Sequence, residues 1–255
     1  GIVSRGYKGK SVIWPLQVTA DSDPTLVGDE AAMIVSRTGC PMVIGPERCK
    51  AIDQLLLHSR CNVIISDDGL QHYAMGRDIE IVVADGARGF GNGMMLPAGP
   101  MRESKSRLKR AHYIVTNGST LPESYGMYVR GDSLASLHDG SRKLRLKDLK
   151  GQQVHALAAI GNPQRFFELL RNAGLDVVEH AFPDHHQFTP VDLDFSQSAT
   201  PVVMTEKDAV KCRQHAHLLE PGRYWYLPVT AQLSPVFVEA LTRHIETVAN
   251  AKKAA

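Results

Sequence analysis

The sequence predicts an α/β protein whose sheets are mainly parallel, and three observations support this fold class. Apolar runs of strand length recur along the 255 residues. Most of these runs are continuous rather than alternating, which is typical of strands covered on both faces. Helix-length segments separate several of the runs, as they do in sheets built from parallel strands.

The expected strands are the apolar runs themselves, which are bounded by turn-forming residues. None of them approaches the roughly 20 consecutive apolar residues that a membrane-spanning helix needs. They cover residues 1–4, 41–45, 62–66, 79–84, 113–117, 154–160, 176–182, 201–205 and 224–229.

Three helices are expected between or after these strands. The clearest covers 162–174, where Asn162 can cap the helix and Pro163 suits its first position. A second helix is expected at 27–39, with acidic residues in its first turn and a glycine at its end, and a third at 235–250.

The chain is expected to form two α/β lobes joined by a thin connector. Between residues 119 and 152 the sequence changes to short, charged pieces punctuated by glycine, which is typical of a boundary. We therefore predict an N-terminal lobe over 1–125, a connector over 126–152 and a C-terminal lobe over 153–255.

Composition limits the class of protein more than it identifies a partner. Apolar residues make up 43% of the chain, enough for a real core, and the formal net charge of +2 gives no general attraction to nucleic acid. The cysteines form neither a CxxC pair nor a zinc-type spacing, so no metal is assigned to them and a reduced, cytoplasmic setting is expected. They are Cys40, Cys49, Cys61 and Cys212.

Two adjacent acids follow the expected strand at 62–66. Asp67 and Asp68 lie in "SDDG", where ligands bind beyond the carboxyl ends of strands in open α/β sheets. One carboxylate together with substrate phosphates is a common way to hold Mg²⁺. The alternative, in which one aspartate caps the next turn and the other is solvated, is equally compatible with this stretch alone.

A second acid lies beside two histidines after the expected strand at 176–182. In "PDHHQF", Asp184 precedes His185, and such a pair can fix the tautomer of the imidazole and raise its basicity for proton transfer. A surface loop with adventitious histidines is the competing interpretation, and for an isolated motif of this kind it is the favoured one.

Two basic stretches give weaker signals. "GYKGKS", residues 6–11, is not a phosphate-binding P-loop, because only two residues separate Gly6 from Gly9 where four are required. Residues 101–113 concentrate arginine and lysine, which suits a phosphorylated or membrane-surface ligand, although most such runs are solvated helix faces.

Taken together and in order, several stretches resemble the tetraacyldisaccharide 4′-kinases, the lipid A 4′-kinases of Gram-negative bacteria. These stretches are "SRGYKGK", "VGDEA", "SDDGLQH", "RDIEIVVADG", "LPAGPMRE", "RFFELL", "FPDHHQF" and "MTEKDAVK". The resemblance covers nearly the whole chain, and "DDGLQH" followed by "LPAGPMRE" is its most specific part. It implies a P-loop-kinase-like α/β lobe and a second, smaller α/β lobe joined by a two-stranded connector.

The resemblance also implies a reaction and a set of site residues. The reaction is transfer of the ATP γ-phosphate to the 4′-hydroxyl of a tetraacyldisaccharide 1-phosphate, giving lipid IVA, at the cytoplasmic face of the inner membrane. Asp67 and Asp68 resemble the acids that hold Mg²⁺, Asp29 resembles the base on the sugar hydroxyl, and His185, paired with Asp184, resembles its assistant. Asp29 also has an alternative role as a helix N-cap. Further positions that resemble nucleotide-binding or other site residues are Arg5, Tyr7, Gln71, His72 and Arg102.

The chain departs from the family pattern at its start. Family members carry a glycine-rich GK[ST] loop ahead of "SRGY", together with an N-terminal hydrophobic helix, and both would precede Gly1. Without that loop there is no nest of backbone N–H groups for the phosphates, so this polypeptide is expected to bind ATP poorly and to be inactive alone. Ala31, where the family usually has proline, is expected only to loosen a helix start.

Other functions stay open on the sequence alone. A non-catalytic α/β module that binds the acylated disaccharide phosphate is the main alternative, and a Mg²⁺-dependent hydrolase that uses Asp67 or Asp68 with His185 is the weakest. For the kinase we expect a monomer whose partners are the lipid substrate and the inner-membrane surface, and no nucleic acid.

Overall fold

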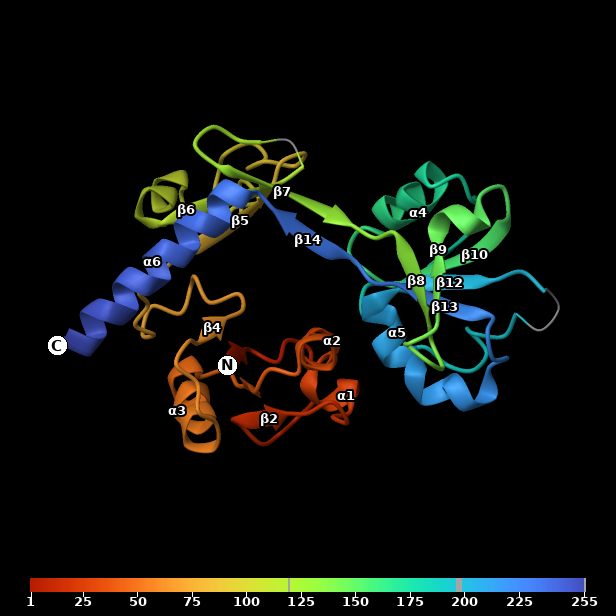
Figure 1. Cartoon of the computed structure of the whole chain (residues 1–255), viewed down its shortest axis with the longest axis horizontal. Helices are drawn as coiled ribbons and strands as arrows, with labels where there is room; N and C mark the ends of the chain where they lie inside the picture. Colours follow the sequence, from red (N-terminus) through yellow and green to blue (C-terminus); the bar gives the residue numbers. More distant parts are fainter. Residues whose placement is uncertain (119, 196–198, 255) are drawn as a thin grey trace. The chain divides into compact units, whose positions relative to one another are not determined.

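The computed structural model describes residues 1–118, 120–195 and 199–254, and it confirms the α/β class. The described residues form three sheets, which have mixed but mostly parallel strands (Figure 1). The chain divides into two compact units. Unit 1 comprises Gly1–Met75 and Gly131–Pro228, and unit 2 comprises Gly76–Arg130 and Val229–Ala255.

The first sheet of unit 1 has the strand order β2-β3-β1-β4. Strands β1, β3 and β4 are parallel, and β2 runs antiparallel at the edge. Helix α2 packs on one face of the sheet and α3 on the other, so Val3, Met42 and Ile44 are fully buried. The elements are β1 (Ile2–Ser4), β2 (Leu16–Val18), α1 (Pro24–Val27), α2 (Asp29–Thr38), β3 (Met42–Ile44), α3 (Arg48–His58) and β4 (Ile65–Ser66).

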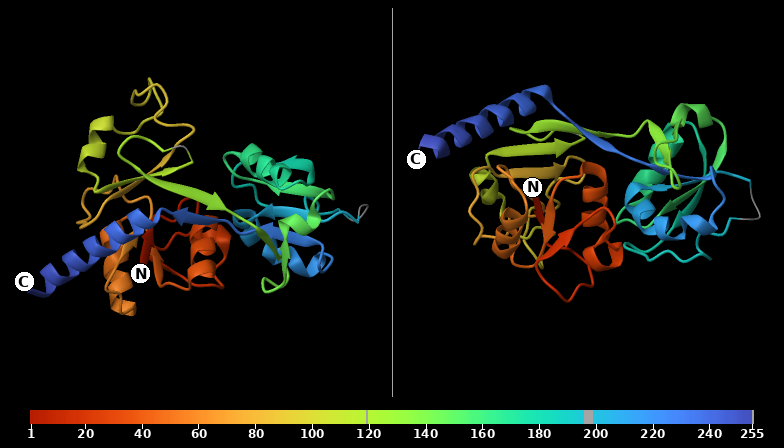
Figure 2. Two further views of the ribbon diagram at one scale, coloured as in Figure 1. Left: turned by 45° about the horizontal axis from the view of Figure 1, so that its top comes forward. Right: turned by 60° about the horizontal axis from the view of Figure 1, so that its bottom comes forward.

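The second sheet of unit 1 has the order β11-β10-β12-β13-β8-β9. Its first four strands are parallel. Strand β8 pairs antiparallel with β13, and β9 pairs antiparallel with β8 at the edge. Helices α4 and α5 cover opposite faces (Figures 1 and 2). The elements are β8 (Ser133–Ser136), β9 (Lys143–Arg145), β10 (Gln153–Ala158), α4 (Pro163–Asn172), β11 (Asp176–Ala181), β12 (Val202–Thr205), α5 (Glu206–Cys212) and β13 (Tyr224–Leu227).

Unit 2 contains the third sheet, in the order β14-β7-β6-β5, and one long helix. Its core is aromatic, because the ring of Phe237 from α6 packs against the rings of Tyr113 and Tyr125. The elements are β5 (Ile81–Asp85), a 3-10 helix η1 (Lys105–Arg110), β6 (Tyr113–Asn117), β7 (Tyr125–Arg130), β14 (Thr230–Leu233) and α6 (Pro235–Ala254). No helix in the described part of the chain combines the length and apolarity that crossing a membrane requires.

The predicted helix at 162–174 is present as α4, and its start follows the expected chemistry. Pro163 is the first helical residue, and the side chain of Asn162 accepts a hydrogen bond from the backbone N–H of Arg165. The predicted helix at 27–39 is confirmed as α2, which has Asp29 and Glu30 in its first turn and Gly39 as its C-cap. The short helix α1 precedes it and ends before Gly28.

The grouping of segments differs from the predicted lobes 1–125 and 153–255 with a connector at 126–152. Strands β8 and β9, which lie in the predicted connector, join the six-stranded sheet. Beyond Pro228 the chain returns to unit 2, where β14 pairs with β7. These pairings join segments that are far apart in the sequence, so a local change of composition could not reveal them. Residue 119, where that change of composition begins, lies outside the described residues.

The two glycines that bound α2 make different demands on the backbone. Gly28 has φ 88° and ψ 143°, and a Cβ atom there would lie 2.7 Å from the carbonyl oxygen of Tyr7. Gly39 has φ 63° and ψ 7°, the left-handed helical region, with open space around it. Only the second conformation is one that asparagine adopts readily.

We therefore expect Gly28→Asn and Gly39→Asn to differ in stability. Gly28→Asn should lower the free energy of unfolding by about 1–3 kcal/mol, because it combines a forbidden backbone region with a clash. Gly39→Asn should stay within about 0.5 kcal/mol of wild type. Urea denaturation followed by circular dichroism measures both, and equal losses would contradict the assigned start of α2.

Candidate active site

Asp29 is the first residue of α2, and its carboxylate is buried at the N-terminus of that helix. Gly28 occupies the N-cap position, and no side chain caps the helix. The alternative role of Asp29 as an N-cap is therefore wrong, because the residue lies one position inside the helix. Its side chain is only 6% exposed, so the carboxylate needs partners.

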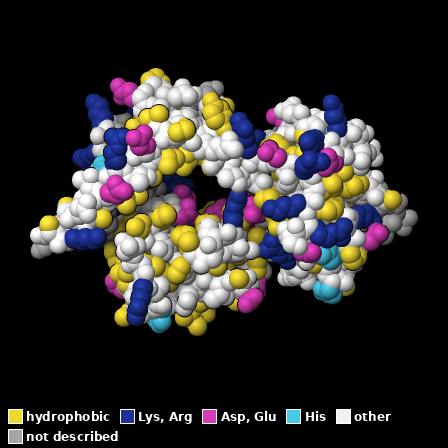
Figure 3. Space-filling view, in the orientation of Figure 1, with side chains coloured by type: hydrophobic (Ala, Val, Ile, Leu, Met, Phe, Trp, Pro, Cys, Tyr) yellow, Lys and Arg dark blue, Asp and Glu magenta, His cyan; other side chains and the backbone are white. Residues whose placement is uncertain are grey.

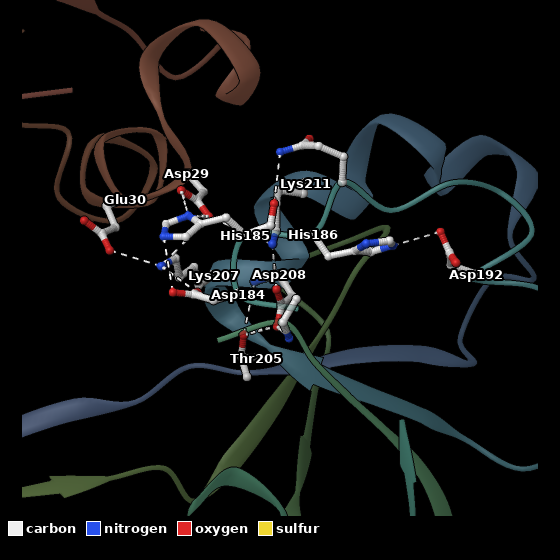
Figure 4. A network of polar contacts seen from close by, with 12 residues as sticks. Asp29, Glu30, Asp184, His185, His186, Asp192, Thr205, Lys207, Asp208 and Lys211 are labelled. Carbon is white, nitrogen blue, oxygen red and sulfur yellow. Dashed lines mark hydrogen bonds and ion pairs between the residues drawn. The ribbon is translucent and has the colours of Figure 1, made fainter. Parts of the chain in front are cut away.

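His185 is the closest of these partners. Its Nδ1 lies 3.0 Å and 3.1 Å from the two carboxylate oxygens of Asp29 (Figure 4). On the other side of the ring, Nε2 lies 3.6 Å from a carboxylate oxygen of Asp184. The backbone of His185 has φ 65°, and its N–H donates to the carbonyl of Ala159 at the end of β10. The loop after β11 thus holds the imidazole between two carboxylates.

Two lysines from α5 face the same carboxylates (Figure 4). Lys207 donates to Glu30 at 3.1 Å, and its Nζ lies 3.9 Å from Asp184 and 4.0 Å from Asp29. Lys211 follows one turn later, with Nζ 3.9 Å from Asp29. The cluster therefore carries both signs of charge within a few ångströms.

The start of α5 explains why these lysines are fixed. Thr205 caps the helix by accepting from the backbone N–H of Asp208, and its hydroxyl donates back to the Asp208 carboxylate at 2.6 Å. That carboxylate also accepts from the backbone N–H of Ala159 at 3.0 Å. The sequence "TEKD" therefore forms a variant of the capping box that anchors α5 to the end of β10.

A second acidic site lies at the carboxyl edge of the first sheet, where β1 and β4 end. Ser4 donates from its hydroxyl to the carboxylate of Asp67 at 3.0 Å. Asp68 follows with φ 48°. Arg48 is buried beneath them, and its guanidinium donates to the carbonyls of Gly45 at 2.7 Å and Asp67 at 3.3 Å.

Electrostatics connects this edge to the first turn of α2. Burial raises the pKa of Asp67, and the negative charges of Asp68 and Glu30 raise it further, whereas the hydrogen bond from Ser4 and the charge of Arg48 lower it. Burial likewise lowers the pKa of Arg48, and the positive charge of Arg5 adds to that effect while Asp67 and Asp68 oppose it. A cation placed at this edge would relieve the accumulation of negative charge.

The structure brings together some of the predicted site residues and separates others, and their roles stay predictions. Asp29, Asp184 and His185 form one cluster, and the ring of Tyr7 meets that of His185 edge-on at 5.8 Å between centroids. Arg5 lies close enough to act on Arg48 beside Asp67 and Asp68. Gln71 and His72 occupy the turn that follows, in unit 1, and Arg102 belongs to unit 2.

Sequence reasoning missed several residues that complete the site. Glu30, Lys207, Lys211 and Asp208 belong to the cluster around Asp29, and Arg48 belongs to the sheet edge. For the two lysines, the sequence did contain a signal. Their spacing of four residues in "TEKDAVK" places them on one side of a helix that follows a strand directly.

A cavity of about 310 Å³ lies away from these residues. It is lined mainly by apolar and small side chains near the amino ends of β1 and β3, including Val18, Met42 and Leu55. Ligands of open α/β sheets bind at the opposite, carboxyl ends, so we place the candidate site there and not in this cavity.

Comparison with known proteins gives a consistent family. A family model described as tetraacyldisaccharide-1-P 4′-kinase matches residues 1–246. Curated tetraacyldisaccharide 4′-kinases from Nitrosococcus oceani and Methylobacillus flagellatus are 49% and 47% identical, over 93% and 94% of this chain and 68% and 71% of their own length. The relative from Hahella chejuensis is 43% identical over 99% of this chain and 74% of its own.

A solved structure agrees on the fold. The crystal structure of LpxK from Aquifex aeolicus, described as a complex with ATP, superposes with a TM-score of 0.74 over 97% of this chain and 78% of that one, at 23% identity. At that identity the likeness establishes the P-loop-kinase-like α/β fold alone. With the family match over most of its length, the chain belongs to the tetraacyldisaccharide-1-phosphate 4′-kinases, which are phosphotransferases.

Proposed function

We propose that this protein transfers the γ-phosphate of ATP to the 4′-hydroxyl of tetraacyldisaccharide 1-phosphate, giving lipid IVA and ADP. The observation that carries the proposal is the buried Asp29–His185 pair, with Nδ1 3.0 Å from the carboxylate, in a chain of this family. The relatives' names supply the substrate, and the ATP complex of the Aquifex structure supports the nucleotide.

The chemistry needs a base, charge neutralisation and positioning. In this proposal the 4′-oxygen forms a bond to the γ-phosphorus while the bond from that phosphorus to the ADP oxygen breaks. The hydroxyl proton goes to the Asp29 carboxylate, whose orientation His185 fixes. Asp184 lies on the far side of the imidazole, so the ring is held between two carboxylates. Phosphoryl transfer depends mainly on such positioning and electrostatics.

Mg²⁺ is proposed to bind at the edge formed by Asp67 and Asp68. The donor chemistry fits, because two carboxylates lie together there and burial with neighbouring negative charge raises the pKa of Asp67. Among the described residues no cluster of three or more His, Cys, Asp or Glu side chains could hold a metal. That agrees with a magnesium ion that takes one or two carboxylates and completes its shell with phosphates and water.

Five further residues are proposed to contact nucleotide or substrate. Arg5 and Tyr7 follow β1, which ends at the same sheet edge as Asp67. Gln71 and His72 follow Asp68 directly. Arg102 belongs to unit 2, where it begins the basic segment 102–110.

We also propose that the protein works as a monomer at the cytoplasmic face of the inner membrane. Hydrophobic and charged side chains are interspersed on the face drawn in Figure 3, so single exposed apolar residues carry no argument. Met94, Met95 and Leu96 are different, because three consecutive apolar residues are each more than half exposed. Lys105 approaches the preceding residues of the same loop, because its Nζ lies 5.3 Å from the ring centroid of Phe90 and would lie 3.3 Å from a Cβ at Gly93. Apolar tips flanked by lysine suit an anionic bilayer.

The catalytic pair gives the first functional prediction. In the full-length gene product, Asp29→Asn and His185→Ala should each lower kcat by about 10²–10⁴-fold, the usual contribution of general-base catalysis. ATP affinity, measured by isothermal titration calorimetry, should change far less. Asp53→Asn, an exposed aspartate on α3, is the matched control and should leave kcat unchanged. Normal turnover by Asp29→Asn at saturating substrate would refute its role as base.

The proposed Mg²⁺ site gives the second functional prediction. Asp67→Asn and Asp68→Asn should raise the Mg²⁺ concentration needed for half-maximal rate by about tenfold or more, because each removes one charged ligand or its neighbour. Varying Mg²⁺ at fixed ATP measures this effect. Asp21→Asn, exposed in the same unit, should titrate like wild type. If neither variant shifts the Mg²⁺ dependence, the ion binds elsewhere.

The proposed membrane contact gives the third functional prediction. Replacing Met94, Met95 and Leu96 together by serine should reduce sedimentation with vesicles that contain anionic phosphatidylglycerol, since apolar contact is lost. Val191→Ser, which alters an 83% exposed apolar residue of unit 1, should not. Unchanged sedimentation of the triple variant would remove this loop from the membrane contact.

A further inference from the structure

Lys211 is buried in the polar cluster around Asp29, and no step of the proposed reaction uses it. Its side chain is 1% exposed, and Nζ lies 2.8 Å from Oδ1 of Asp208 and 3.9 Å from Oδ2 of Asp29 (Figure 4). The same ammonium lies 5.1 Å from the ring centroid of Phe188, which closes that side with an aromatic face. Neither Nζ of Lys211 nor Oδ1 of Asp208 makes a hydrogen bond to a described residue, so the contact between them is an ion pair.

Asp208 supplies the fixed end of this arrangement. Its side chain is completely buried, and its Oδ2 accepts from the backbone N–H of Ala159 and from the hydroxyl of Thr205. Both donors belong to ends of the six-stranded sheet, so this carboxylate cannot move without breaking the start of α5. Its other oxygen, Oδ1, faces Lys211.

Asp29 lies on the other side of the same ammonium, and it is surrounded by titratable groups. Glu30 follows it on α2, Asp184 and His185 approach from the loop after β11, and two lysines approach from α5. The carboxylate of Asp208 lies next to Lys211, and the phenol of Tyr7 lies beside His185. The complete set is Glu30, Asp184, His185, Lys207, Lys211, Asp208 and Tyr7.

The two lysines do not play the same part. Lys207 is 18% exposed and hydrogen-bonds to Glu30, so solvent and a second carboxylate share its charge. Lys211 is shielded from solvent, and its ion pairs within the described part of the chain are with Asp208 and Asp29. At a separation near 4 Å, a charge in a dry site acts several-fold more strongly than one facing water.

We propose that Lys211 is a positioning residue for the reaction, which connects the anchored Asp208 to Asp29 and keeps the Asp29 carboxylate ionised and directed. This inference rests on the proposed function of Asp29 as the base. Lys211 itself, buried behind that carboxylate, is not proposed to contact substrate. Its removal would leave two buried carboxylates with one cation fewer between them, and such uncompensated charge favours uptake of a proton.

The test is the pH dependence of kcat in the full-length gene product with Lys211→Met. We expect the acidic limb of the profile to move to higher pH by about one unit, the smallest shift expected on losing an opposite charge within about 4–6 Å. The rate on that limb should then fall about tenfold, while the KM for ATP stays within about twofold. Lys143→Met, at an exposed position of β9, is the control and should match wild type.

A double variant separates this role from a purely structural one. If Lys211 only neutralised Asp208, then Asp208→Asn/Lys211→Met would restore the wild-type profile, and that result would overturn the inference. We expect the acidic limb of the double variant to remain shifted. Lys211→Arg, which keeps the charge, should hold the limb near its wild-type position even if kcat falls. Where Lys211→Met does not fold, these two variants decide the question.

The outcomes also distinguish this inference from the proposed function. A wild-type protein that transfers no phosphate, or Asp29→Asn with undiminished kcat, refutes the function and leaves nothing for Lys211 to position. An active wild type whose acidic limb stays in place in both Lys211→Met and the double variant refutes the role of Lys211 alone.

Discussion

The burial of Asp29 is the constraint on which the rest of the site depends. A carboxylate that is 6% exposed must be paired, and removing one partner of such a buried pair typically costs about 3–5 kcal/mol. Its partners are His185, in the loop after β11, and Lys211, on α5, which both accompany the six-stranded sheet. Asp29 is on α2, which packs on the first sheet. Exposed contacts between α2 and α5, such as Arg37 with Glu206, add little by comparison. The Asp29–His185 pair is therefore also part of what joins the two sheets of unit 1.

Charge balance explains why acids follow so many strands. Asp67 and Asp68 at one sheet edge and Asp29 and Glu30 at the next helix start place negative charge in one region. Burial raises the pKa of Asp67, and the charges of Asp68 and Glu30 raise it further. The buried Arg48 offsets only part of this negative charge, because its guanidinium hydrogen-bonds to two backbone carbonyls. A region built this way would gain stability from a bound cation.

Much of the fold could be predicted from local sequence, and the reasons differ between elements. Continuous apolar runs predicted most central strands because strands covered on both faces are apolar throughout, and Asn162 with Pro163 predicted the start of α4 by direct hydrogen-bonding chemistry. Strand β2 and helix α5 were not predicted, because segments of 3 and 7 residues carry too little periodicity. The return of β14 and α6 to unit 2 was not predictable either, since partner choice depends on contacts far apart in the sequence.

The site shows the same division between local and long-range information. In isolation, "PDHHQF" favoured adventitious surface histidines, and His186 does pair with Asp192 only six residues away. His185 differs because Asp29 lies 156 residues from it, and only the family resemblance indicated that the two belong together. Lys207 and Lys211 gave a helical spacing but no sign of the carboxylates that they would meet.

The position of Asp29 one residue inside its helix excludes the N-cap role and leaves its carboxylate for other partners. The carboxylate of an N-cap aspartate accepts hydrogen bonds from backbone N–H groups. Such hydrogen bonds lower the pKa of a carboxylate and make it a weaker base. Here Gly28 takes the cap position, and its positive φ, which a side chain would not tolerate against Tyr7, turns the chain so that Asp29 begins the helix. The carboxylate still benefits from the positive end of the helix dipole, yet both of its oxygens lie within reach of His185. Gly28 has no side chain, and by taking the cap position it leaves the Asp29 carboxylate to contact His185 instead of capping the helix.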